Sequence, residues 1–257
     1  DDYVLNGSKI WTTHAQWADM IFCLVRTSRE GKHQEGISFI VFPMTLPGIK
    51  ISPLPTLDGP AEGGQEINQV FFEDVRVPIA EALVGEENKG WTYAKYLLQF
   101  ERGNAYAPGL RAMLNKARKI ASVEETGGDA LIRDHDFARK LAQLEIKIDS
   151  LDATEQRIFS ALAAGQAVGP ESSMLKCAGS ETQQAITELV IEAAGTYGAP
   201  FVRDNFALVR EGANADLPFP SYSVSAVPSY FNYRKTSIYA GSNEIQRNIM
   251  AKMVLGL

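Results

Sequence analysis

The chain changes character at Val70-Phe71-Phe72-Glu73-Asp74-Val75-Arg76-Val77-Pro78, which leads through Leu83-Val84-Gly85 to Gly90-Trp91. Before this stretch, short runs rich in Val, Ile, Phe and Thr alternate with Gly and Pro, a pattern typical of antiparallel strands joined by turns. The predicted strands are Lys9–Thr12, Met20–Thr27, Ile37–Pro43, Ile49–Leu54 and Asn68–Phe72. We therefore expect residues 1–84 to form a partial antiparallel β domain, a truncated barrel or sandwich.

Helical periodicity dominates the rest of the chain. Apolar residues recur at intervals of three and four, and the predicted helices are roughly 88–125, 135–165, 171–196 and 226–255. Pro170 stands near a helix start and Gly195 near a helix end. Because amphipathic helices of this length bury their stripes against one another, residues 85–257 are predicted to form an antiparallel four-helix bundle. The predicted fold class is α+β.

The composition excludes several classes of protein. The 257 residues carry 25 Lys and Arg against 31 Asp and Glu, a net charge of −6 without a basic block, which argues against nucleic-acid binding. No apolar run reaches the roughly 18 residues of a membrane span, so no membrane insertion is expected. Cys23 and Cys177 are too few for a disulfide framework, and the 3 His are scattered. We expect a cytoplasmic protein without a metal site.

One carboxylate stands in an apolar stripe. The residues at spacings of three and four are Trp91, Ala94, Leu98, Glu101 and Ala105. Burial at this place would favour the protonated form of Glu101, which is the condition that makes a carboxylate useful as a general base near neutral pH. The alternative is structural: Glu101 pairs with Arg102 or lies at the wet edge of the stripe.

A second local feature is Ile238-Tyr239-Ala240-Gly241-Ser242-Asn243-Glu244-Ile245-Gln246, within the last predicted helix. Glycine in a helix interior costs about 1 kcal/mol relative to alanine. A position without a Cβ lets another group approach the backbone closely, and a hydroxyl, an amide and a carboxylate follow it. The alternative is a kink or a break in the helix.

Three segments together resemble the acyl-CoA dehydrogenase family. Asn6-Gly7-Ser8-Lys9-Ile10-Trp11-Thr12-Thr13-His14-Ala15 is similar to the family's strand beside the flavin. The stretch from Val70 to Trp91 resembles the exit from the family's β domain into its helical domain. Ile238–Gln246, with Asn248-Ile249-Met250-Ala251 after it, resembles the terminal helix. The resemblance spans essentially the whole chain, and residues 230–257 are most similar to the bacterial branch with pimeloyl-CoA dehydrogenase large subunits.

The resemblance implies a flavoprotein oxidoreductase of fatty acid and lipid metabolism. Its reaction is α,β-dehydrogenation of an acyl-CoA thioester to a trans-2-enoyl-CoA, in which a carboxylate removes the α-proton and hydride passes to FAD. In many members the base is the Glu before the Gly of the terminal motif, where this chain has Ala240. Other members place the Glu on the first bundle helix, directly before an Arg. Glu101 and Arg102 match that pattern and are the implied catalytic residues.

The resemblance also implies a cofactor site and partners. The positions implied to bind FAD are Trp11, Thr12, Thr13, Gly241, Ser242 and Glu244. Electron-transfer flavoprotein is the implied electron acceptor. Apolar residues on more than one helix face, such as Leu189, Ile191 and Ile249, favour a homo- or hetero-oligomer, a dimer or a tetramer.

Departures from the family pattern keep alternatives open. The stretch from Arg118 to Gly128 lacks the family's Phe-Gly pair, and Ile191–Tyr197 lacks the Gln and first Gly of a second motif. Both motifs serve cofactor binding across the subunit interface, so a heteromeric complex is plausible. The alternatives to the dehydrogenase are a non-catalytic scaffold subunit, and an acyl-CoA oxidase or flavin monooxygenase on the same fold.

The start of the chain gives a further expectation. Family members carry an N-terminal helical domain and further strands before the segment that begins here with Asp1. We therefore expect an N-terminally incomplete β domain, no N-terminal helical domain, and weak or no FAD binding by this chain alone.

Overall fold

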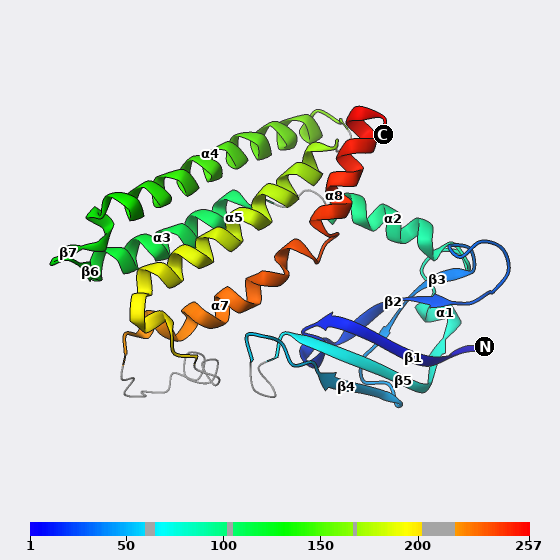
Figure 1. Cartoon of the computed structure of the whole chain (residues 1–257). Helices are drawn as coiled ribbons and strands as arrows, with labels where there is room; N and C mark the ends of the chain where they lie inside the picture. The colour runs from blue at the N-terminus through cyan, green and yellow to red at the C-terminus, as the bar shows by residue number, and fades with distance from the viewer. Residues whose placement is uncertain (60–64, 102–104, 167–168, 202–218) are drawn as a thin grey trace. The chain divides into compact units, whose positions relative to one another are not determined.

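The computed structural model of the chain describes residues 1–59, 65–101, 105–166, 169–201 and 219–257 (Figure 1). The chain divides into two compact units, Asp1–Glu101 and Arg102–Leu257. The mixture of small antiparallel sheets with long helices confirms the predicted α+β class. None of the helices among these residues is both long and apolar enough to cross a membrane.

The first unit consists mainly of two antiparallel sheets. The strands are β1 (Asp2–Thr13), β2 (Met20–Arg26), β3 (Ile37–Pro43), β4 (Ile49–Pro53) and β5 (Ile67–Pro78). They form a three-stranded sheet in the order β1-β5-β4 and a two-stranded sheet β2-β3. The short helices are η1 (Ala15–Trp17) and α1 (Ile79–Ala82), followed by α2 (Gly90–Glu101).

Both sheets contribute to one hydrophobic core. Val70 and Phe72 of β5 lie in it with Ile40 and Phe42 of β3, and the rings of Phe42 and Phe72 meet edge to face with centroids 5.9 Å apart. Buried residues of β3 (Ser38, Ile40 and Phe42) alternate with partly buried ones, as expected for a strand with one face on a core. The described residues of this unit therefore form an open sandwich, without a closed barrel.

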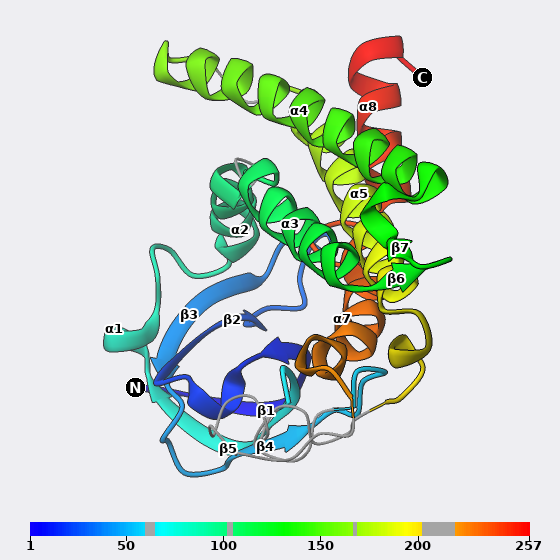
Figure 2. The same ribbon diagram turned by 90° about the vertical axis from the view of Figure 1, so that its left-hand side faces the viewer.

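The second unit is built around three long helices. These are α3 (Ala107–Val123), α4 (His135–Ala163) and α5 (Glu171–Ala194). They lie side by side, and consecutive helices run in opposite directions (Figure 1, Figure 2). The hairpin β6 (Glu125–Thr126) and β7 (Asp129–Ala130), with η2 (Leu131–Arg133), joins α3 to α4. After α5 come η3 (Gly195–Gly198), η4 (Ser221–Ser225), α7 (Ala226–Asn232), η5 (Tyr233–Ser237), α8 (Asn243–Met250) and the π-helical η6 (Ala251–Leu255).

Two of the four predicted helices are interrupted. The segment predicted as one helix over 88–125 contains α2 and α3, and α3 starts afresh with Pro108 in its first turn. Proline lacks the N–H that a continuing helix needs, but it fits a first turn. The last predicted helix, 226–255, is broken between η5 and α8, so the break considered at Gly241 is real. The fourth element of the bundle is thus a succession of short helices packed on α5.

The burial of some apolar residues on the helices differs from what the sequence predicts. Leu189, taken from the sequence as a candidate for contact with another subunit, is 3% exposed and belongs to the unit's own core. Ile191 is only partly buried against that core, and Ile249 is half-buried. Of the apolar stripe on α2, Ala94 is buried, whereas Trp91 is 38% and Leu98 46% exposed.

Candidate functional site

The end of β1 carries an irregularity that presents an indole to solvent. Between Lys9 and Thr12 the strand advances by three residues, while its partner β5 advances by two, from Val70 to Asn68. The extra residue is accommodated with Trp11 at φ 63°, a left-handed conformation that bulky side chains rarely adopt. The side chain of Trp11 is 67% exposed. Strain of this kind persists only where the surroundings fix it, and it gathers at binding sites.

Buried amides of neighbouring residues fix this bulge. Asn68, fully buried on β5, donates from Nδ2 to the carbonyl of Thr12 at 3.2 Å and to Oε1 of Gln16 at 2.7 Å. Its Oδ1 accepts from Nε2 of Gln65 at 3.0 Å, and Nε2 of Gln16 donates to the carbonyl of Gln65 at 2.6 Å. The family resemblance implied Trp11 but not these amides, whose partners lie as far as 56 residues away.

Thr12 and Thr13 lie beside Trp11 at the same strand end. Thr12 is half-buried and faces Asn68, and Thr13 is exposed and faces Ile67. The chain then turns at His14, which has φ 53° and stacks on Trp17 with ring centroids 5.0 Å apart. These three predicted residues therefore form one group with an aromatic face and two hydroxyls.

The second group lies in the turn before α8. Ala240 has φ 53° and Gly241 has φ 81°, two successive left-handed residues. A Cβ at Gly241 would lie 2.3 Å from Nε2 of Gln246, so the backbone there closes over that side chain. Ser242 caps α8 and its Oγ accepts from the N–H of Ile245 at 3.4 Å.

Glu244 lies in the first turn of α8 with its side chain in solvent. A hydrogen bond from its own backbone N–H, and a second from the Ser242 hydroxyl, lower the pKa of its carboxyl. The negative charge at a helix N-terminus is favourable. Gly241 and Glu244, which are exposed, and Ser242, which is half-buried, therefore form a polar corner. Each of the two groups of predicted residues lies within its own unit.

A buried polar network ties this corner to α5. Oγ of Ser173 donates to Oε1 of Gln246 at 2.8 Å, and Nζ of Lys176 donates to Oδ1 of Asn243 at 2.8 Å. Ser180 also hydrogen-bonds the side chain of Asn243. Sequence reasoning missed these residues, because nothing local in α5 indicates which distant segment they meet.

The predicted catalytic pair is only partly visible. Glu101 is the last residue of α2, but its side chain lies outside the described residues, and so does Arg102. Their catalytic roles therefore stay predictions.

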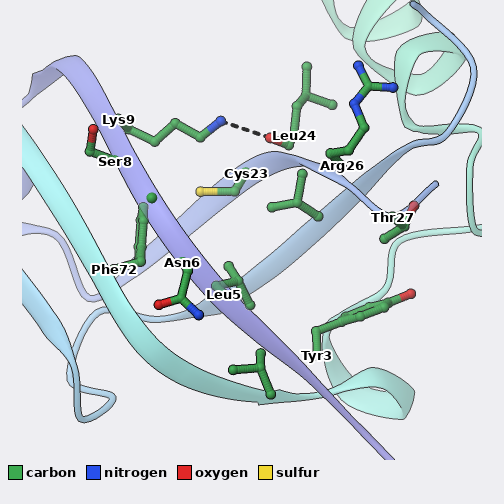
Figure 3. Close-up of a pocket in the computed structure, with 13 residues that line it drawn as sticks. Tyr3, Leu5, Asn6, Ser8, Lys9, Cys23, Leu24, Arg26, Thr27 and Phe72 are labelled. Carbon is green, nitrogen blue, oxygen red and sulfur yellow. Dashed lines mark hydrogen bonds between the residues drawn. The ribbon is translucent and has the colours of Figure 1, made fainter. Parts of the chain in front are cut away.

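The described residues also hold no cluster of three or more His, Cys, Asp or Glu side chains suited to a metal ion. A cavity of about 420 Å³ lies between β1 and β2, where Lys9 donates to the carbonyl of Leu24 at 2.8 Å (Figure 3). Trp11 and the two threonines do not line it.

Comparison with known families decides the relationship. Residues 1–75 match the model of the acyl-CoA dehydrogenase middle domain, and residues 88–255 match that of the acyl-CoA dehydrogenase C-terminal domain. The chain belongs to the acyl-CoA dehydrogenase family. Members of this family bind FAD and oxidise acyl-CoA thioesters.

Acyl-CoA dehydrogenases of mycobacteria are among the relatives. IpdE1 of Mycolicibacterium smegmatis is 30% identical over 258 residues, which are 99% of this chain and 58% of that protein. FadE26 of Mycobacterium tuberculosis is 30% identical over 267 residues, covering 100% of this chain and 62% of the relative. The chain thus spans about three fifths of the length of these acyl-CoA dehydrogenases.

The chain is also similar to a solved structure. The ChsE4-ChsE5 complex from Mycobacterium tuberculosis superposes with a TM-score of 0.77 at 28% identity, over 100% of this chain and 62% of that one.

The residues present fit a flavin. Each group suits part of such a cofactor by itself. In the first unit, an exposed indole on a fixed, strained bulge suits stacking on a planar ring. In the second unit, the exposed turn at Gly241 presents polar backbone beside the Ser242 hydroxyl.

Proposed function

We propose that the chain is part of an FAD-dependent acyl-CoA dehydrogenase in which Glu101 removes the α-proton of the thioester. The observation that carries this proposal is the pair of family matches, which together span both units of the chain. The bulge at Trp11 and the turn at Gly241 support it, because both present strained, solvent-facing backbone held by buried polar side chains.

Glu101 is favoured as the base because the other position that family members use for it cannot accept a proton in this chain. Many family members carry the base directly before the glycine of this turn. In this chain that position is Ala240, which is exposed and has only a methyl side chain. A methyl group cannot accept a proton. Glu101 followed by Arg102 matches the second family pattern. The guanidinium of Arg102 is assigned to fixing the electrostatic surroundings of that carboxylate.

The remaining residues are assigned to holding the cofactor. When bound, FAD serves as the two-electron oxidant that accepts the β-hydrogen as hydride. Trp11 would stack on the ring system and keep water away, and Thr12 and Thr13 would offer hydroxyls to it. Gly241 and Ser242 offer backbone and a hydroxyl at the head of α8, and Glu244 offers an acceptor for a ribose or amide donor.

Partners and location follow from the same proposal. Electron-transfer flavoprotein is the proposed electron acceptor, and a dimer or tetramer is the proposed assembly. A cytoplasmic location is supported by Cys23 and Cys177, which are both buried and free.

A non-catalytic subunit of a heteromeric enzyme is the second candidate. It is favoured by the similarity to the ChsE4-ChsE5 complex, which joins two different chains. Ala240, at a position where many members carry the base, favours it as well.

One experiment separates the two candidates. The full-length protein is purified alone and with any subunit that co-purifies, and each sample is titrated anaerobically with acyl-CoA thioesters of several chain lengths. The dehydrogenase binds a yellow flavin that at least one thioester bleaches. A chain that holds no flavin, or holds one that no thioester bleaches, is the scaffold subunit.

A further inference from the structure

A buried lysine lies directly behind the turn that precedes α8. Lys176, in the second turn of α5, is 7% exposed. Its Nζ donates to Oδ1 of Asn243 at 2.8 Å, and that acceptor is a neutral amide rather than a carboxylate. Burial lowers the pKa of the ammonium group. Taking an ammonium out of water is costly, and a methionine of similar length would fill the same space, so packing alone does not explain a lysine here.

The lysine determines which way the Asn243 amide faces. An ammonium group only donates hydrogen bonds, so the amide must turn its oxygen toward Lys176. Its Nδ2 then points toward Oγ of Ser180 at 3.1 Å and Oε1 of Glu181 at 3.4 Å. Glu181 in turn pairs with Arg247. The first residue of α8 is thereby held in one orientation on the surface of α5.

A second contact holds the same turn one helical step away. Ser173 lies three residues before Lys176 on α5, so both face α8. It binds Oε1 of Gln246, whose Nε2 reaches the carbonyl of Ala240 at 3.5 Å. Just before Asn243 lie the left-handed residues Ala240 and Gly241, which are exposed. A strained, exposed turn fixed from behind by buried polar groups is an arrangement typical of a binding surface.

We propose that Lys176 is a positioning residue: its buried ammonium orients Asn243 and thereby holds the turn from Ala240 to Ser242 in the conformation that receives the flavin, a role that rests on the function proposed above.

The test compares two lysines of the same unit in the full-length protein. Lys176→Met removes the ammonium and keeps the length of the side chain. Lys116→Met is the matched control, because Lys116 is half-buried on α3 and its Nζ donates to Oγ of Ser225 at 2.7 Å, a contact with η4 rather than with this turn. Amide hydrogen exchange is followed without FAD, and FAD affinity is measured by titration.

Lys176→Met is expected to speed exchange of the amides at 240–246 by about tenfold and to weaken FAD binding by a similar factor. Exchange in α3 and α4 stays slow, Lys116→Met leaves both readouts at the turn unchanged, and Lys176→Arg restores part of the affinity. If Lys176→Met does not fold, Asn243→Ala, which removes the acceptor, is expected to give the same two changes.

The proposal is overturned if the Lys176 and Lys116 variants behave alike, or if the turn loosens while FAD affinity stays at the wild-type value. The two hypotheses fail separately. Wild-type protein that binds no FAD contradicts the proposed function, and the exchange measurement then still decides whether Lys176 holds the turn.

Discussion

Trp11 combines two properties that normally oppose each other, a large apolar side chain and a left-handed backbone. A bulky residue in this region costs about 1–2 kcal/mol, and the indole is 67% exposed, so little packing offsets that cost. The buried Asn68 supplies the constraint by holding the carbonyl of Thr12. The residue is therefore better explained by binding than by stability.

Replacing Trp11 should separate these two roles. Asparagine tolerates left-handed backbone, so Trp11→Asn is expected to raise the free energy of unfolding by about 0.5–1 kcal/mol and to weaken FAD binding by at least about tenfold. Urea unfolding and FAD titration of the full-length protein measure the two effects. Trp17→Asn is the control, and it should lower stability because Trp17 stacks on His14. A Trp11 variant that is clearly less stable than wild type contradicts this account.

The thiol of Cys23 gives a prediction about pH. Burial raises the pKa of Cys23 to about 11, since the side chain lies in the core of the β unit. The folded thiol keeps its proton while the unfolded thiol loses it near its ordinary pKa of about 8.5. The contribution of Cys23 to stability is therefore complete below about pH 8.5 and is lost as the pH rises toward 11. Urea unfolding at several pH values should show a steeper loss for wild type than for Cys23→Ala; equal slopes would show that the thiol is not protected.

At the scale of elements, the sequence predicts best what depends on local pattern. The strand Ile37–Pro43 was predicted with its observed bounds, because it is a short run rich in Ile, Val and Phe that follows Gly36. The interruption before α3 was missed, since apolar spacing continues across it and only Pro108 marks a new first turn. The start of α3 also depends on Glu155, 1% exposed on α4, which accepts from the N–H groups of Tyr106 and Ala107 at 2.6 and 3.2 Å. No local pattern reveals a partner 49 residues away.

Glu155 should be essential to that helix start. Glu155→Ala leaves the N–H groups of Tyr106 and Ala107, at the start of α3, without their acceptor and should lower the free energy of unfolding by about 2–4 kcal/mol. Glu155→Gln keeps one carbonyl oxygen at the site and should cost less. Chemical denaturation of both variants tests this, and a loss below about 1 kcal/mol for the alanine variant would show that other groups define the start of α3.

Two isoleucines on α4 form a matched pair for the core of the helical unit. Ile148 is 1% exposed, whereas Ile146, half a turn away, is 65% exposed. Ile148→Ala should cost about 2–5 kcal/mol because it leaves a cavity, and Ile146→Ala should stay within about 0.5 kcal/mol. Thermal and urea unfolding measure both. Equal losses would mean that the outward face of α4 is buried in an assembly.

At the scale of the whole molecule, the site depends on the resemblance more than on pattern. Helical periodicity drew attention to Glu101, and a glycine within a predicted helix drew attention to Gly241, but each kept a structural alternative. For Gly241 the structure shows a turn, and the helix that follows it is hydrogen-bonded to α5. This hydrogen bond joins Lys176 and Asn243, which are 67 positions apart. Such pairings become visible only in the folded chain. The role of Glu101 stays a prediction.

The central claim is that Glu101 is the proton acceptor, and anaerobic stopped-flow reduction of the flavin by acyl-CoA tests it most directly. Glu101→Gln in the full-length protein should retain FAD, because the amide is nearly isosteric, and should slow flavin reduction by about 10²–10⁴-fold. The control is Glu86→Gln, an exposed carboxylate just before α2 that should leave the rate unchanged. A Glu101→Gln protein that holds FAD and is reduced at a near wild-type rate would contradict the account and place the base elsewhere.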